Sequence, residues 1–154
     1  MPKTLLLIAH APSPNTQALI LACQRAVDAC GCEQTQLLVK SCSETDAKAI
    51  QQADALLLLT PENLGYMSGA MKDVFDRIYY PCLEVTQGKA VAAIIRAGHD
   101  GTGTRRALES ITSGLRWRWV QEPLILRGEW QDEYTEASAT LAMAMAAALD
   151  SGII

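Results

Sequence analysis

Three segments of the chain combine short polar side chains with backbone-permissive residues, and each of them follows an apolar run. Hydroxyls, amides and accessible backbone N–H groups of this kind bind phosphates and the edges of flat ring systems. We assign these segments no catalytic nucleophile and no metal ligand, and we predict a ligand-binding site. Its candidate residues are Ser13, Asn15, Thr16, Gln17, Thr60, Pro61, Glu62, Asn63, Leu64, Gly65, Tyr66, Ala97, Gly98, His99 and Gly101.

The first segment, residues 13–17, lies where a helix should begin after an apolar strand over residues 4–9. Its hydroxyl and amide side chains stand beside the free amides and the positive dipole end of that helix, which together bind anions. The same residues also fit ordinary helix capping by Ser13 or Asn15. Position favours a phosphate site, because the cap follows the first strand of a βα series.

The second segment, residues 60–69, joins an apolar run to an amphipathic helix. Residues 55–59 show no polar alternation, which indicates a strand buried on both faces of a parallel sheet. We expect Thr60-Pro61 to force the chain out of regular geometry, because proline lacks a donor and restricts the residue before it. The two glycines that follow admit a flat ligand, and Tyr66 could lie against it. A tight connection with a surface tyrosine is the alternative.

The third segment, residues 96–104, follows another apolar strand over residues 89–95 and opens a further helix. Its glycines would let backbone amides face the edge of a ligand. His99 could act as an acid there, or it could be a solvated loop histidine. The same alternatives, contact with a ligand's phosphates or a solvated position, apply to Arg96, Arg105 and Arg106.

The remaining segments complete an alternation of strands and helices. We predict strands over residues 4–9, 33–39, 55–59, 89–95 and 117–126. Pro123 within the last of these marks an edge strand or a bulge. The expected helix boundaries are a stop at Gly31, a cap at Ser43 or Thr45, a stop at Pro81 and a start at Asp132 or Glu133. This alternation predicts one α/β domain over residues 1–154, with a parallel sheet covered by helices on both faces.

Composition narrows the class of protein further. The chain has 154 residues and is 49% hydrophobic, which is ample for one core, and its net charge of −4 argues against a nucleic-acid surface. The apolar run over residues 5–9 is too short for a signal peptide or a membrane span, so we expect a cytoplasmic protein. The five cysteines lack C-x-x-C spacing, and we expect buried thiols, with a redox-active Cys30-Gly31-Cys32 as the alternative.

The second segment and its helix, TPENLGYMSGAMKDVFDR, resemble a flavin-contacting loop of the flavodoxin-like NAD(P)H-dependent FMN reductase family, in which T/S-P-E/x-x-x-G-x-x-x-G-x-x-K recurs. The stretch H-x-P-S-x-N-T from His10 looks like the phosphate loop of the same family, and the third segment resembles its third flavin loop. The resemblance implies a flavodoxin-like three-layer α/β/α sandwich whose five-stranded parallel sheet has the order 2-1-3-4-5.

The resemblance also implies a function. In such a protein the three segments meet at one rim of the sheet, where residues 13–17 hold the phosphate of FMN and residues 60–66 and 97–101 lie along its ring. NAD(P)H would be the co-substrate and a small molecule the electron acceptor, and the chain would form a homodimer without nucleic-acid or membrane partners. The alternatives are a flavodoxin-type one-electron carrier and a flavodoxin-like binding module that has lost its flavin.

Overall fold

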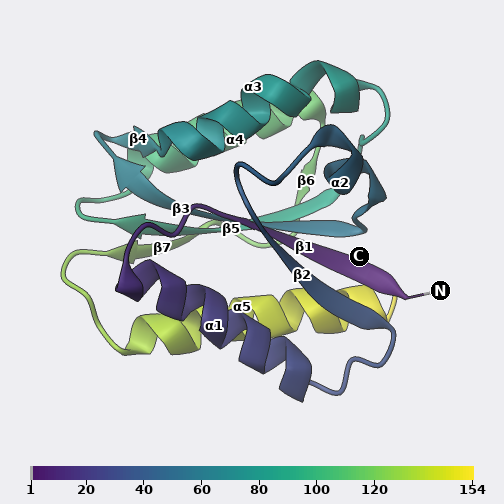
Figure 1. Ribbon diagram of the computed structural model, residues 1–154, viewed down its shortest axis with the longest axis horizontal. Coiled ribbons are helices and arrows are strands. Elements are labelled where there is room, and N and C mark those ends of the chain that lie inside the picture. The colour runs from purple at the N-terminus through teal and green to yellow at the C-terminus, as the bar shows by residue number, and fades with distance from the viewer. Residues whose placement is uncertain (1) are drawn as a thin grey trace.

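The computed structural model describes residues 2–154 as a central β-sheet between two layers of helices (Figure 1). The strands are β1 (Lys3–Ala9), β2 (Thr35–Ser41), β3 (Ala55–Asn63), β4 (Tyr66–Met67), β5 (Ala90–Ala97), β6 (Arg118–Trp119) and β7 (Leu124–Arg127). The helices are α1 (Pro14–Ala29), α2 (Ala47–Gln52), α3 (Gly69–Leu83), α4 (Thr102–Leu115) and α5 (Glu133–Asp150). Helices α1 and α5 cover one face of the sheet, and α2, α3 and α4 cover the other.

The order of the strands confirms the predicted fold class. The main path is β2-β1-β3-β5-β6, with β7 also paired to β5, and all of these pairs are parallel. The predicted fourth strand is therefore β5, and the predicted fifth strand is divided into β6 and β7. Pro123 lies just before β7, and because proline has no amide to donate, it separates the two short strands.

The core explains why the central strands are apolar throughout. Along β3, Leu56 and Leu58 pack under α3 and α4, whereas Leu57 and Leu59 pack against α1 and α5. Successive side chains of a strand point to opposite faces, so a strand covered on both faces has no position for a polar residue. The same alternation holds for β1 and β5, which flank β3.

Two helix boundaries differ from the prediction. Helix α3 continues through Pro81 to Leu83, because a proline this close to the end of a helix removes only one hydrogen bond. Helix α2 begins later than expected, and its cap is Asp46, whose carboxylate accepts from the Ala49 amide at 2.8 Å. Thr45 instead donates its hydroxyl to the Ser41 carbonyl at 2.8 Å.

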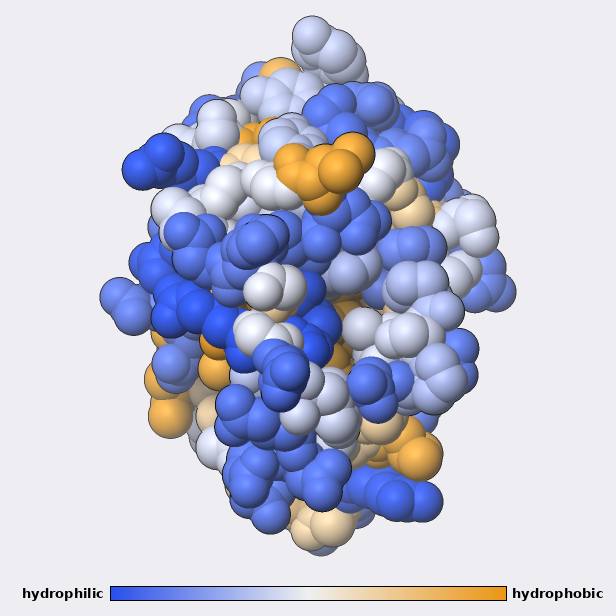
Figure 2. Space-filling model, turned by 90° about the vertical axis from the view of Figure 1, so that its left-hand side faces the viewer, coloured by the Kyte–Doolittle hydropathy of each residue, from blue (hydrophilic) through white to orange (hydrophobic). Residues whose placement is uncertain are grey.

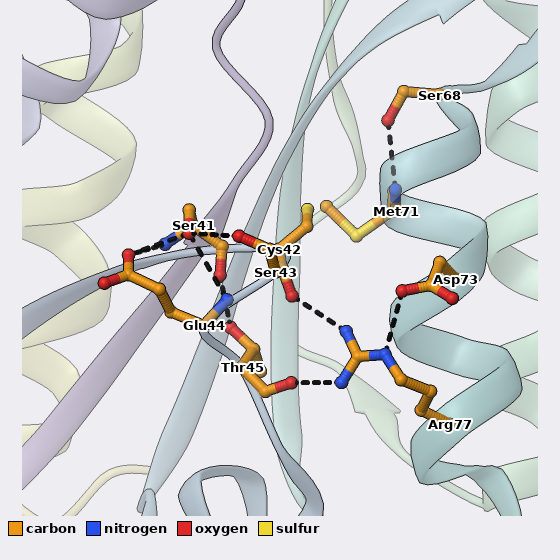
Figure 3. Close-up of polar contacts among 9 residues, drawn as sticks. All are labelled: Ser41, Cys42, Ser43, Glu44, Thr45, Ser68, Met71, Asp73 and Arg77. Carbon is orange, nitrogen blue, oxygen red and sulfur yellow. Dashed lines mark hydrogen bonds and ion pairs between the residues drawn. The ribbon is translucent and has the colours of Figure 1, made fainter.

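Arg77 of α3 holds the loop between β2 and α2 in place (Figure 3). Its guanidinium donates to the carbonyls of Thr45 at 2.6 Å and Cys42 at 2.9 Å, and it pairs with Asp73 at 2.8 Å. In the same loop, Glu44 accepts from the Ser41 amide at 3.2 Å. Arg77 of α3 therefore provides the hydrogen-bond donors for two carbonyls of this loop. The Glu44 carboxylate, within the loop, provides the acceptor for the Ser41 amide.

The cysteines fall into two groups. Cys23, Cys42 and Cys82 are buried free thiols, as predicted, and burial raises the pKa of Cys23 to about 12 and that of Cys42 to about 11. Cys30 and Cys32 form a disulfide across Gly31, so the expectation of buried thiols was wrong for these two residues. Gly31 has a φ of 73°, which allows α1 to stop where the sequence predicted.

None of the described helices is long and apolar enough to cross a membrane.

Candidate functional site

The three predicted segments lie along one edge of the sheet. Strands β1, β3 and β5 are parallel neighbours, in which Ala9 pairs with Leu59 and Thr60 pairs with Ile95. The loops that follow these strands therefore leave the sheet at the same side, on the left of Figure 1 and facing the viewer in Figure 2. We call this edge, formed by residues 10–17, 60–68 and 97–102, the rim.

The start of α1 satisfies most of its own polar groups. Ser13 Oγ accepts from the Thr16 amide at 3.1 Å, and Thr16 Oγ1 accepts from the Ser13 amide at 3.1 Å, which is a reciprocal capping box. Pro14 has no amide hydrogen, so among the described residues the Asn15 amide is the first-turn donor that this cap leaves open. The side chains of Asn15 and Gln17 are exposed beside it.

Strand β3 does not end at Thr60-Pro61, contrary to the prediction. It remains extended to Asn63, with Pro61 in register with Arg96, and then turns back as the short strand β4. The turn consists of Leu64 and Gly65, with φ values of 54° and 75°. Two consecutive positive φ values define the hairpin turn that matches the twist of antiparallel strands, so the proline lies in a strand and the hairpin supplies the reversal.

The base and the tip of this hairpin face different surroundings. Thr60 is fully buried, its Oγ1 accepts from the Ser68 amide at 3.0 Å, and Ser68 in turn caps α3 by accepting from Met71 at 3.1 Å. Leu64 and Tyr66 are exposed at the tip, where a ligand could reach them. Of the predicted hairpin residues, Thr60 therefore supports the start of α3 through Ser68, whereas Leu64 and Tyr66 are accessible to a ligand.

Glu62 connects the hairpin to the loop between β5 and α4. One of its carboxylate oxygens accepts from the His99 amide at 3.2 Å and the other from the Gly101 amide at 2.9 Å. Gly101 has a φ of 71° and occupies the N-cap of α4 without any side-chain cap. Asp100 accepts from the Thr102 amide at 3.0 Å, and this hydrogen bond lowers the pKa of Asp100. Ala97 is buried, whereas Gly98 and His99 are exposed.

A fourth loop, residues 128–132 between β7 and α5, reaches the rim together with Arg127 at the end of β7, and the sequence did not predict it. The Gly128 amide donates to the Ala97 carbonyl at 2.9 Å, and Arg127 Nε donates to the Asp100 carbonyl at 2.9 Å. A glycine directly after a short apolar strand was the available signal, but the strand had been assigned an earlier end. These two hydrogen bonds hold the β5–α4 loop from the side of β7.

The arginines near the rim have partners within the protein. Arg96 donates to the Leu126 carbonyl at 3.0 Å, and its guanidinium lies 5.8 Å from the Trp130 ring centre and 5.2 Å from that of Tyr134. Such stacking holds a cation on an aromatic face. Arg105 forms ion pairs with Glu109 at 3.4 Å and with Glu122 at 4.0 Å. These contacts favour structural roles for both arginines over contact with a ligand's phosphates.

The rim is mainly polar, with small hydrophobic areas between the polar side chains (Figure 2). Two hollows lie away from the rim, one of about 520 Å³ at the amino end of β2 beside Cys32 and one of about 280 Å³ beside Tyr79 and Tyr80. At the rim itself Leu64, Tyr66 and His99 are exposed, so a ligand there would rest on loops and remain partly open to solvent.

The parallel order, the helix layers and the loops that meet at the rim define a flavodoxin-like α/β protein. Solved structures agree in fold at low identity: an archaeal flavodoxin with a TM-score of 0.77 and 16% identity over 94% of this chain and 96% of that one. A flavodoxin, WrbA-like protein from Agrobacterium tumefaciens gives 0.72 and 14% over 99% of both chains. A general stress protein 14 from Treponema denticola, solved in complex with FMN, gives 0.68 and 18% over 96% and 99%.

The chain belongs to the NADPH-dependent FMN reductase family, whose model matches residues 18–132. This match covers the hairpin and the β5–α4 loop and begins just after the capping box of α1. No curated protein sequence matches the chain. The family is one of flavin-dependent oxidoreductases, and the match agrees with the resemblance found in the sequence.

Proposed function

We propose that the protein binds FMN at the rim and uses NADH or NADPH to reduce it, passing the electrons to a small-molecule acceptor. The observation that carries this proposal is the meeting of the three loops at one edge of the sheet in a chain of this family. Ligands of open α/β sheets bind at the carboxyl ends of the strands, where the connections diverge. In this sheet β1 and β3 are the strands from which the chain departs in opposite directions.

The residues present fit the phosphate end of FMN. The open Asn15 amide lies at the start of α1, where the helix dipole favours an anion. The exposed side chains of Asn15 and Gln17 add amide donors, and the half-buried Ser13 hydroxyl can direct its hydrogen to a phosphate while its oxygen keeps the cap. Thr16 was predicted as a ligand contact, but it is buried and its hydroxyl donates to the Ser13 carbonyl at 3.0 Å, so it would support the cap from beneath. This cluster contains no cationic side chain, so binding would rest on neutral donors.

The residues of the hairpin fit the ring system. Pro61, Asn63 and the exposed Leu64 and Tyr66 would line one side of the isoalloxazine, and Gly98 offers an open backbone on the other loop. Thr60 and Ala97 are buried, so they would support these contacts from beneath. When bound, the flavin itself supplies the site that accepts and donates a hydride, and the protein has to hold and orient it.

Absorption spectroscopy and a turnover assay test this proposal. Purified protein incubated with FMN and freed of excess ligand should absorb at about 450 nm, the range of bound flavin. With NADH or NADPH and a quinone or ferricyanide, it should oxidise the nicotinamide over many cycles. A protein that takes up no FMN contradicts the proposal at its first step.

A flavodoxin-type electron carrier is the second candidate, because the fold is shared with flavodoxins. Such a carrier would bind FMN equally well and exchange single electrons with a protein partner. Binding of FMN without turnover of either nicotinamide cofactor would favour it. Failure to bind FMN at all would favour a flavin-free binding module.

We also propose that the chain acts as a homodimer in the cytoplasm. The support is the exposure of Leu64 and Tyr66 at the rim, where a second copy could cover the part of a bound ring that this chain would leave open to solvent. Light scattering during gel filtration, with and without FMN, measures the mass in solution. A monomer under both conditions contradicts the dimer.

A further inference from the structure

Glu62 has an unusual position among the acidic residues of the rim, because it satisfies the backbone of a loop far away in the sequence. Its two carboxylate oxygens accept separately from His99 and Gly101, at 3.2 and 2.9 Å. Glu62 is itself fixed in the hairpin by its pairing with Met67. The carboxylate therefore joins two loops that the sequence separates by 37 to 39 residues.

The β5–α4 loop needs such a partner. Gly98 and Gly101 lose more backbone entropy on ordering than other residues would. The N-cap of α4 is Gly101, which has no side chain to accept from the first-turn amides. A carboxylate at this helix start is favoured both by the helix dipole and by charge-assisted hydrogen bonds.

A second contact joins the same two loops independently of Glu62. A Cβ atom on Gly103 would overlap the carbonyl oxygen of Gly65, so the first turn of α4 lies directly against the tip of the hairpin. The hairpin and the start of α4 therefore pack against each other at two places. Glu62 accepts hydrogen bonds from the β5–α4 loop, and Gly65 at the tip of the hairpin lies directly against Gly103.

We propose that Glu62 is the positioning residue of the flavin site, an inference that rests on the proposed function. It would orient the β5–α4 loop so that the exposed backbone at Gly98 and the hairpin tip face the ring together. The amides of His99 and Gly101 are directed at Glu62, so they would act behind the ring-facing surface and not as donors to the ligand. This changes the earlier expectation for those two residues from ligand contacts to supports.

Glu62→Gln tests the proposal, because it keeps the size of the side chain but replaces one acceptor oxygen by an NH₂ group that would face an amide donor. Glu44→Gln is the matched control, since Glu44 also accepts from a backbone amide in a loop that follows a strand. We expect FMN affinity, measured by quenching of flavin fluorescence, to fall about tenfold in Glu62→Gln and to change less than about twofold in Glu44→Gln. Glu62→Asp, whose shorter side chain keeps the charge, should recover part of the loss.

A measurement on the wild-type protein without flavin covers the case in which the variant folds poorly. The Gly101 amide should exchange its hydrogen with solvent markedly more slowly than the Gly98 amide, and its proton resonance should lie downfield, as expected for a bond to a carboxylate. Equal exchange rates at Gly98 and Gly101 would overturn the proposal without any variant.

The outcomes separate this inference from the proposed function. Wild-type protein that binds FMN, together with a Glu62→Gln variant that binds it equally well, would overturn the role of Glu62 alone. Wild-type protein that binds no FMN would overturn both. Weaker binding in Glu62→Gln with an unchanged visible spectrum of the bound flavin would also count against positioning, because a misplaced ring changes its surroundings.

Discussion

Two parts of the rim solve the same problem in different ways. The start of α1 satisfies its backbone locally, through Ser13 and Thr16, which are three residues apart. In the β5–α4 loop, the amides of His99 and Gly101 are instead satisfied by Glu62, which lies in β3 within the hairpin. The first arrangement can form as soon as α1 forms, whereas the second requires the sheet to be assembled. Loss of the capping box should therefore disturb only the start of α1. Loss of a contact between the hairpin and the β5–α4 loop should disturb both of these segments.

The largest effect is expected at the contact between the two loops. Gly103→Ala places a methyl group against the Gly65 carbonyl oxygen, and because that atom belongs to the backbone, the hairpin has to shift. We expect a loss of about 3 kcal/mol of unfolding free energy, at the upper end for overpacking, measured by urea denaturation. Gly69→Ala is the control, since nothing lies within 4 Å of a Cβ atom there. Equal stability of both variants would show that the loops are not docked.

The capping box should give a smaller and more confined effect. Ser13→Ala removes the acceptor for the Thr16 amide and should cost about 1 kcal/mol of stability, as measured by thermal unfolding. The amide exchange of Gly101 should stay unchanged, because no hydrogen bond found among residues 2–154 joins the capping box to the β5–α4 loop. A faster exchange at Gly101 would show that the two parts of the rim are coupled.

Asn15→Ala separates ligand binding from stability at the same helix start. Its side chain is exposed, so stability should change by less than about 0.5 kcal/mol. FMN affinity should fall, because one amide donor near the phosphate is lost, and the fluorescence titration measures this. Lumiflavin, which has no phosphate, should bind the variant and the wild type equally.

Leu64→Asn should stabilise the hairpin slightly. Leu64 has a φ of 54°, which is costly for a leucine, and its side chain is fully exposed, so no packing is lost. Asparagine followed by Gly65 is a preferred sequence for such a turn, and we expect a gain of about 1 kcal/mol in thermal unfolding. A loss of stability would indicate that Leu64 is buried by a second chain in solution.

The smallest effect concerns the pH dependence of the β5–α4 loop. The Thr102 amide lowers the pKa of Asp100, so the folded state binds this proton less readily than the unfolded state. The contribution to stability is then present above the unfolded pKa and is lost as the pH falls through the lowered value. An NMR titration of Asp100 should show a midpoint below that of an unstructured aspartate, and a normal midpoint would mean that the hydrogen bond is absent in solution.

Much of the fold was predictable because its signals are local. The apolar runs that became β1, β3 and β5 leave no polar position on either face, and the glycine at residue 31 marks the end of α1. The strand order was inferred from the resemblance. The extension of β3 through Pro61 was not predictable from local rules, because it depends on pairing with β4 and β5.

The site was predictable in its location but not in its internal connections. Loops after parallel neighbouring strands must share an edge, so the meeting of residues 13–17, 60–66 and 97–101 follows once the strand order is known. The hydrogen bonds of Glu62 and the stacking of Arg96 on Trp130 involve residues brought together only by the tertiary fold. No spacing in the sequence marks such pairs.

Titration of the purified wild-type protein with FMN is the most direct measurement of flavin binding at the rim. We predict saturable quenching of flavin fluorescence with one FMN per chain, an absorption band at about 450 nm, and weaker binding in Asn15→Ala and Glu62→Gln. Fluorescence that stays at the level of free FMN at every protein concentration would contradict a flavin site in this protein.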